Sequence, residues 1–351
     1  MPISLHNALD NLMQATYRKG RPGAALLLSL GGELLFEKGY GCANLGTSES
    51  ITPATNFRLA SVSKQFTAMC VQLLQQQGLL TYEDKLYGYF PALIHFGGDI
   101  SINHLICHTS GLPDFEEFVE DDRQEQVKES EVLRITAAQP RLYFKPGSQY
   151  RYSNTGYVLL ALLVEKVSGM PYAEFLQKYI FEPLDMANTV LYEAGKRIPN
   201  RAIGYARNAA GEVILSDQSA CSATKGDGCI YTSVHDYLKW HEALLTNDAF
   251  KLDATLENIS TTIGNNPGWR YGMGWFYANR SNGSHEFYHT GSTCGFSNLV
   301  IRVPESQLLV ACFSNIADNP YLLTSLIDVL QQYPETRLES DLVRQLLGLT
   351  R

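Results

Sequence analysis

Three short groups of residues, in a fixed order along the chain, carry side chains that acyl transfer needs. They are Ser61-Val62-Ser63-Lys64, Tyr152-Ser153-Asn154 and His289-Thr290-Gly291. A serine hydroxyl is a weak nucleophile at neutral pH, so it attacks an acyl carbon only with a base within hydrogen-bond reach. The three groups together could supply a nucleophile, a base and polar groups that line the opposite side of the substrate-binding site.

The first group predicts a nucleophile next to its base. Residues 61–77 have helical periodicity, and residues three apart on a helix share one face, so the amine of Lys64 should lie over Ser61. Tyr152 can act as a phenolate if nearby cations lower its pKa, and Asn154 can hydrogen-bond Lys64 or an incoming amide. A serine at a helix start is often only a cap, but these partners favour catalysis at Ser61.

These motifs resemble those of the penicillin-recognising serine hydrolases, and most of all the class C β-lactamases and their relatives, which include D-stereospecific peptidases and family VIII esterases. The resemblance extends from about Gly23 to about Asn315. Tyr152 stands where other members have the serine of S-D-N, and His289 stands where many have the lysine of K-T-G. The resemblance implies that the backbone N–H groups of Ser61 and Ser292 form an oxyanion hole.

Two further segments have simpler interpretations. Residues 108–111, His-Thr-Ser-Gly, imitate the third motif, but they follow an apolar helical run and precede Pro113, so they are expected to end a helix, with His108 structural. Gly291 is expected to let a substrate approach the backbone of a strand closely. Ser63, the rival nucleophile, points elsewhere around the helix and is expected to be a packing residue.

Composition narrows the class of protein. The chain of 351 residues is 45% hydrophobic, with a formal net charge of -8 and no basic cluster, so a nucleic-acid partner is not expected. Seven cysteines without a C-x-x-C pattern indicate neither a disulfide framework nor a zinc site. The first ten residues lack signal-peptide character, and no stretch is long and apolar enough to span a membrane, so a cytoplasmic protein is expected. A serine mechanism needs no metal or cofactor, and none is expected.

The order of elements predicts an α/β (α+β) fold of two domains, in which helices flank an antiparallel sheet built from both ends of the chain. The sheet domain should comprise residues 1–58 and 205–351, and a mainly helical domain, 59–204, should be inserted into it, with the active site in the cleft between them. An acidic segment, residues 114–131, is expected to be a loop over that cleft. The expected strands are 24–29, 33–38, 272–278, 286–289, 298–303 and 308–314, and the expected helices are 4–18, 67–77, 102–107, 130–138, 155–167, 172–180 and 321–332.

We therefore expect a serine hydrolase that cleaves ester or amide bonds through an acyl-enzyme on Ser61. Lys64 and Tyr152 share the proton transfers, Asn154 orients Lys64 or the substrate, and His289 lines the other wall, facing a carboxylate or Tyr152. A neutral histidine is a weak anchor for a carboxylate, so esterase activity is favoured. β-Lactamase and D-amino-acid peptidase or DD-carboxypeptidase activity remain alternatives, as does a binding or scaffold protein that does not turn over. The expected partner is a small ester, amide, peptide or β-lactam, with no membrane; the oligomeric state is open.

Overall fold

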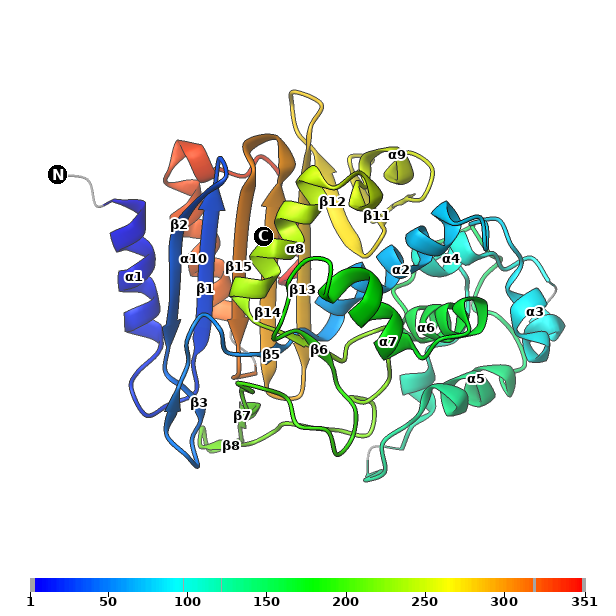
Figure 1. The fold of residues 1–351 in the computed structure, drawn as a ribbon, viewed down its shortest axis with the longest axis horizontal. Helices are drawn as coiled ribbons and strands as arrows, with labels where there is room; N and C mark the ends of the chain where they lie inside the picture. Colours follow the sequence, from blue (N-terminus) through cyan, green and yellow to red (C-terminus); the bar gives the residue numbers. More distant parts are fainter. Residues whose placement is uncertain (1–3, 97, 121, 318–319, 349–351) are drawn as a thin grey trace.

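The computed structural model describes residues 4–96, 98–120, 122–317 and 320–348. Its largest element is an eight-stranded antiparallel sheet in the order β10-β11-β12-β13-β14-β15-β1-β2 (Figure 1). The strands are β1 (Ala24–Leu30), β2 (Glu33–Tyr40), β10 (Thr261–Thr262), β11 (Trp269–Gly272), β12 (Trp275–Asn279), β13 (His285–Thr293), β14 (Phe296–Val303) and β15 (Leu308–Ser314). Ala24 of β1 pairs with Ser314 of β15, so the two ends of the chain form one sheet, and the predicted fold class is confirmed.

The sheet is covered by helices on both faces. In Figure 1, α8 (Val234–Thr246) crosses in front of the sheet and α10 (Pro320–Gln331) lies behind it, next to α1 (Leu5–Thr16). β1 is therefore buried along nearly its whole length, which matches its continuous apolar sequence. The β1–β2 hairpin turns at Gly31 and Gly32, whose φ angles of 61° and 82° are in the region that glycine adopts without strain.

The α8 helix was not predicted from the sequence. Ser233 caps its first turn by accepting the N–H of Asp236, and its buried residues include Tyr237, Trp240 and Leu244, which recur at helical spacing. A helical signal was therefore present in this segment, and the polar residues between the apolar ones masked it.

The remaining helices gather beside the sheet, on the right of Figure 1. Among them α2 (Lys64–Gln76) and α6 (Asn154–Ser168) are buried along most of their length and pack on each other. The others are α3 (Leu86–Tyr89), α4 (Ile102–Ile106), α5 (Glu129–Ala137) and α7 (Tyr172–Leu176); α9 (Asp253–Leu256) and α11 (Leu342–Leu346) lie near the sheet. The small strands are β3 (Cys42–Asn44), β4 (Glu49–Ser50), β5 (Phe57–Arg58), β6 (Val190–Leu191), β7 (Tyr205–Arg207), β8 (Val213–Leu215) and β9 (Ile230–Thr232).

The predicted division into two domains stays a prediction, with a sheet domain of residues 1–58 and 205–351 and a helical domain of residues 59–204. Residues 1–3 and 349–351 of the sheet domain lie outside the described residues. Strands from both predicted domains pair in one small sheet, β5-β9-β6, in which Val190 pairs with Tyr231. This small sheet joins the segment before α2 to the segment before α8.

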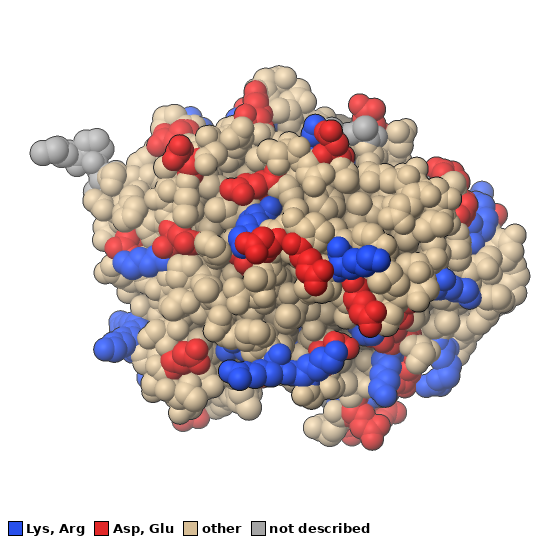
Figure 2. All heavy atoms as spheres, in the orientation of Figure 1, with Lys and Arg blue, Asp and Glu red and all other residues tan. Residues whose placement is uncertain are grey.

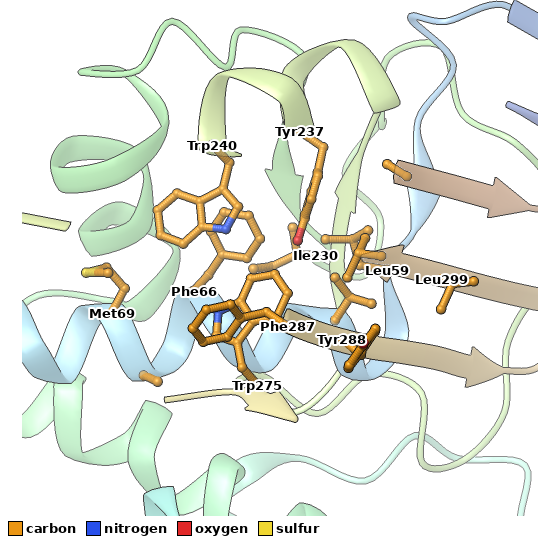
Figure 3. Packing of buried hydrophobic residues seen from close by; sticks show 14 of the residues in the cluster. Leu59, Phe66, Met69, Ile230, Tyr237, Trp240, Trp275, Phe287, Tyr288 and Leu299 are labelled. Carbon is orange, nitrogen blue, oxygen red and sulfur yellow. The ribbon is translucent and has the colours of Figure 1, made fainter. Parts of the chain in front are cut away.

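An aromatic cluster anchors α2 against the sheet and α8 (Figure 3). The rings of Phe66 and Trp240 stack with centroids 4.5 Å apart, and Trp275 and Phe287 of neighbouring strands meet edge to face at 5.8 Å. Such rings contribute large buried areas to a core, so the start of α2 is held firmly at one end of the sheet.

Charges are interspersed over the face shown in Figure 2, with no large area of a single sign. Within the part of the chain that the structure describes, no helix combines the length and the apolar character needed to cross a membrane.

Candidate active site

Ser61 lies in a short 3-10 turn, Ala60–Ser63, between β5 and α2. Sequence periodicity had placed the start of the α-helix at Ser61, whereas the α-helix begins at Lys64. In a 3-10 turn, side chains three residues apart eclipse each other, so this geometry brings Ser61 and Lys64 closer than an α-helix does. Ala60, just before the serine, has a φ of 50°, a conformation that costs energy for a residue with a Cβ atom and that clusters at functional sites.

The amine of Lys64 is fully buried and has three oxygen partners. Its Nζ atom lies 3.1 Å from Ser61 Oγ, 2.7 Å from Asn154 Oδ1 and 2.9 Å from the backbone oxygen of Asp227. As an ammonium group, Lys64 donates one hydrogen to each of these three oxygens. After the loss of one proton it can keep its hydrogen bonds to the last two oxygens, and its lone pair then faces the hydroxyl of Ser61. The arrangement is therefore suited to taking the proton of the serine.

Tyr152 approaches Lys64 through the face of its ring. Lys64 Nζ lies 4.9 Å from the centroid of the Tyr152 ring, while the tyrosine hydroxyl is buried and has no hydrogen-bond partner among the described residues. The ring also packs against His108, with centroids 4.2 Å apart, and stacks on Phe276. The structure thus brings Tyr152 to the nucleophile and its lysine, but no hydrogen bond joins its hydroxyl to Ser61 or Lys64.

His289 is buried rather than exposed to a ligand. Its Nδ1 atom lies 2.6 Å from the backbone oxygen of Thr290, and only 1% of the residue is exposed. Burial, reinforced by the nearby charge of Lys64, lowers the pKa of His289 to about 3, so the imidazole is neutral at physiological pH. The ring packs near Tyr152, at 6.4 Å between centroids, and does not line the cavity next to Ser61. The expectation that His289 lines the other wall and faces a carboxylate or Tyr152 therefore stays a prediction, and of its two forms the packing fits the one with Tyr152.

Gly291 and Ser292 follow on β13 and lie beside the serine turn. A Cβ atom on Gly291 would be 2.1 Å from the backbone oxygen of Leu59, so the close approach at this glycine is made by the protein's own backbone. The expectation that Gly291 also lets a substrate approach the strand stays a prediction. Ser292 is exposed and lines the cavity together with Ser61.

A small cavity of about 130 Å³ borders the nucleophile. Its lining residues come from β5 and the serine turn, the acidic segment before α5, the start of α6, the loop before β9 and the end of β13. They are Arg58, Ala60, Ser61, Glu116, Asn154, Cys221, Ser222, Thr224, Asp227, Gly228, Ser292 and Thr293. Glu116 belongs to the predicted acidic loop, which is ordered here as a 3-10 turn, Phe115–Phe118; Asp121 of that loop lies outside the described residues. The sequence motifs gave no signal for Glu116 or Asp227, and neither carboxyl group was among the site residues expected from the sequence.

The two carboxyl groups in the cavity have raised pKa values. Burial, together with the charge of Glu116, raises the pKa of Asp227 to about 7, against the opposing effect of Lys64. Burial and the charge of Asp114 raise the pKa of Glu116. Thr224 donates a hydrogen bond of 2.9 Å to Asp227, and Thr67 of α2 holds the same loop by donating to the backbone oxygen of Gly226.

The other serines and His108 have structural roles in this arrangement. Ser63 is buried, and its hydroxyl accepts the N–H of Ile230 at 3.2 Å. His108 is buried and accepts the N–H of Ser153 at 3.2 Å, which supports the turn that carries Tyr152. Ser110 is buried and accepts the N–H of Leu112.

The fold and this site define a class of protein, a serine hydrolase of the β-lactamase and penicillin-binding-protein type. The family model described as Beta-lactamase matches residues 5–329, and the chain belongs to that family. It is 31% identical over 323 residues to "Penicillin-binding protein 4*" of Bacillus subtilis, a match that covers 88% of this chain and 71% of that protein.

Solved structures with the same fold support this assignment. The octameric penicillin-binding protein homologue from Pyrococcus abyssi superimposes with a TM-score of 0.79 and 25% identity, over 95% of this chain and 78% of that one. The D-amino acid amidase from Ochrobactrum anthropi SV3 gives a TM-score of 0.77 at 24% identity, over 93% and 99% of the two chains, and shares the fold.

Proposed function

We propose that this protein hydrolyses ester or amide bonds through an acyl-enzyme on Ser61. In this mechanism Ser61 attacks the carbonyl carbon while Lys64 accepts the hydroxyl proton. Tyr152 shares the proton transfers: it returns the proton to the leaving group and later activates the water that releases the acyl group. The backbone N–H groups of Ser61 and Ser292 are proposed to stabilise the oxyanion of each tetrahedral intermediate.

The observation that carries this proposal is the contact of 3.1 Å between Lys64 Nζ and Ser61 Oγ inside a buried, hydrogen-bonded arrangement. Asn154 and the backbone of Asp227 fix the amine from the other side, so little reorganisation is needed when the proton moves. Asn154 is therefore proposed to orient Lys64, the first of its two predicted roles.

Among substrates, we favour neutral esters over β-lactams. The family alternatives, a β-lactamase and a D-amino-acid peptidase or DD-carboxypeptidase, act on substrates with a carboxylate. His289 is neutral and buried, and thus supplies no positive charge for such a group. Amide hydrolysis is the second candidate, because Lys64 and Ser61 serve esters and amides alike.

The deciding experiment compares three substrates: 4-nitrophenyl acetate, a D-alanyl-D-alanine peptide and a chromogenic cephalosporin. We expect the ester to have the highest kcat/KM and the cephalosporin to be hydrolysed slowly or not at all. Preference for the cephalosporin would show a β-lactamase instead. A chain that reacts with a fluorophosphonate at Ser61 but turns over none of the three would support the binding or scaffold alternative.

A cytoplasmic location also stays a proposal, which rests on the cysteine composition. All seven cysteines are free, and Cys70, Cys229 and Cys312 are buried in the core. Thiols of this kind suit a reducing compartment.

A further inference from the structure

A second cavity lies at the other end of the sheet from Ser61. It has a volume of about 360 Å³ and is formed by α8, the β1–β2 hairpin and the turn between β14 and β15. Near the start of β14, Ser297 pairs with Ser292 of the active-site cavity, whereas Gln307 follows the far end of that strand. The lining residues are Ser29, Gly32, Leu34, Leu238, His241, Glu242, Leu245, Thr246 and Gln307. The two cavities therefore have no lining residue in common.

His241 of α8 lines this cavity with a buried polar side chain. The residue is 2% exposed, and neither ring nitrogen has a hydrogen-bond partner among the described residues. The backbone of Gln307 is near the ring and favours its protonated form, but it makes no hydrogen bond of ordinary geometry to either nitrogen. Buried polar groups of native proteins nearly always have a partner, because a buried group without one costs free energy. The histidine therefore requires an explanation that packing alone does not give.

The charges around the cavity indicate an uncharged ligand. Burial, reinforced by the charge of Arg302, lowers the pKa of His241 to about 3, so its imidazole is neutral at physiological pH. No lysine or arginine is among the described residues that line the cavity, so an anion finds no positive charge there. Glu242 is exposed, and water and salt screen its carboxylate, so a cation gains little. One nitrogen of a neutral imidazole donates and the other accepts, and a hydroxyl group can pair with either.

The other side chains of the cavity suit an apolar body. Leu34, Leu238 and Leu245 line it, and Leu34 is 47% exposed, so a ligand that covers this leucine removes apolar surface from water. The volume is within the range of small-molecule sites, about 300–1,000 Å³. We propose that this cavity binds a small neutral molecule with an apolar body and one hydroxyl group, such as a phenol, and that the hydroxyl group pairs with His241. The inference concerns a site apart from Ser61 and does not depend on the proposed function.

The structure holds both walls of the cavity in place. On one side, Tyr237 lies one turn before His241 on α8, and its hydroxyl donates to the side chain of Gln65 on α2 at 2.6 Å. On the other side, a Cβ atom on Gly32 would lie 3.1 Å from the side-chain oxygen of Gln307, so the two turns are in close contact. A ligand therefore meets a site that is already formed, and little free energy is lost in ordering it.

The test compares 4-fluorophenol with 4-fluorotoluene, which have nearly the same shape and differ in a hydroxyl against a methyl group. Binding to the full chain is measured by fluorine NMR at pH 7, where a phenol is uncharged. We expect 4-fluorophenol to bind the wild type saturably and His241→Leu to weaken this binding at least tenfold. Since leucine replaces a polar group with an apolar one, 4-fluorotoluene should bind His241→Leu at least as tightly as it binds the wild type.

His235→Leu is the matched control, because it makes the same substitution on the same helix. His235 is exposed, lies 3.1 Å from Glu37 and does not line the cavity, so this variant should bind 4-fluorophenol as the wild type does. Ser61→Ala should also keep wild-type affinity, because Ser61 lines the other cavity. Loss of binding in Ser61→Ala would place the phenol in the active site and overturn the inference.

Two further results would overturn the inference: no saturable binding of 4-fluorophenol to the wild type, or the same affinity in His241→Leu as in His235→Leu. His241→Leu should fold, because it removes a buried polar group without a hydrogen-bond partner, and urea denaturation checks this. Leu34→Glu provides a second variant at an exposed position of the cavity. It should weaken the binding of both compounds at least fivefold, and wild-type affinities in this variant would also contradict the proposed site.

Discussion

Replacement of Tyr152 by phenylalanine should change activity and stability in different ways. The substitution keeps the ring that packs on His108 and Lys64 but removes the hydroxyl. General acid–base catalysis contributes about 10²–10⁴-fold in rate, so kcat for a neutral ester should fall by about that factor, or about 2.7–5.5 kcal/mol in activation free energy. The free energy of unfolding should stay unchanged or rise by up to about 1 kcal/mol, because a buried hydroxyl without a hydrogen-bond partner is removed.

Tyr150→Phe is the control for this prediction. Its hydroxyl is also buried and has no partner among the described residues, and its ring lies 6.0 Å from the His108 ring. Its stability should therefore respond as that of Tyr152→Phe does, while kcat stays within about twofold of the wild type. Steady-state kinetics and urea denaturation of both variants test the two effects separately. A loss of less than about tenfold in Tyr152→Phe would contradict our reasoning and assign the proton transfers to Lys64 alone.

Three other predictions concern the nucleophile, the serine turn and pH. Ser61→Ala should abolish turnover and fluorophosphonate labelling, and labelling that persists in this variant would refute the assignment of the nucleophile. Ser63→Ala should keep labelling but lower the free energy of unfolding by about 1–3 kcal/mol, because the N–H of Ile230 loses its acceptor. Gly291→Ala should displace the serine turn, because its Cβ atom would lie 2.1 Å from the backbone oxygen of Leu59. Both kcat/KM and the melting temperature should therefore fall. A variant with the kcat/KM and melting temperature of the wild type would show that the strand can move away. The folded-state pKa of Asp227, about 7, is above its unfolded value near 3.8, so the folded state binds this proton more tightly, and stability is lost as pH rises from about 4 to about 7. Asp227→Asn should remove that part of the pH dependence in urea titrations, and an unchanged slope would contradict the assignment.

The sequence determined the elements of the fold that depend on local pattern. The alternation and apolar runs of residues 24–38 and 298–314 predicted strands that the structure contains as β1, β2, β14 and β15. The helix periodicity of 155–167 likewise predicted α6 to within a residue or two. The motif spacing also placed Ser61 and Lys64 on one face, because three residues always bring two side chains together in a helical turn.

Only the tertiary structure decided which polar groups share the cavity and which are buried behind it. His289 belongs to a motif that indicated one side of the site. Its ring is nevertheless buried near Phe276 and Tyr152, since the direction of a side chain depends on its packing against β12 and against the segment before α6. Glu116 and Asp227 are 111 positions apart in sequence, and no local signal shows that they line the same cavity. The hydrogen-bond partners of Lys64 come from α6 and from the loop before β9, so its chemistry was set by long-range packing, which local periodicity does not encode.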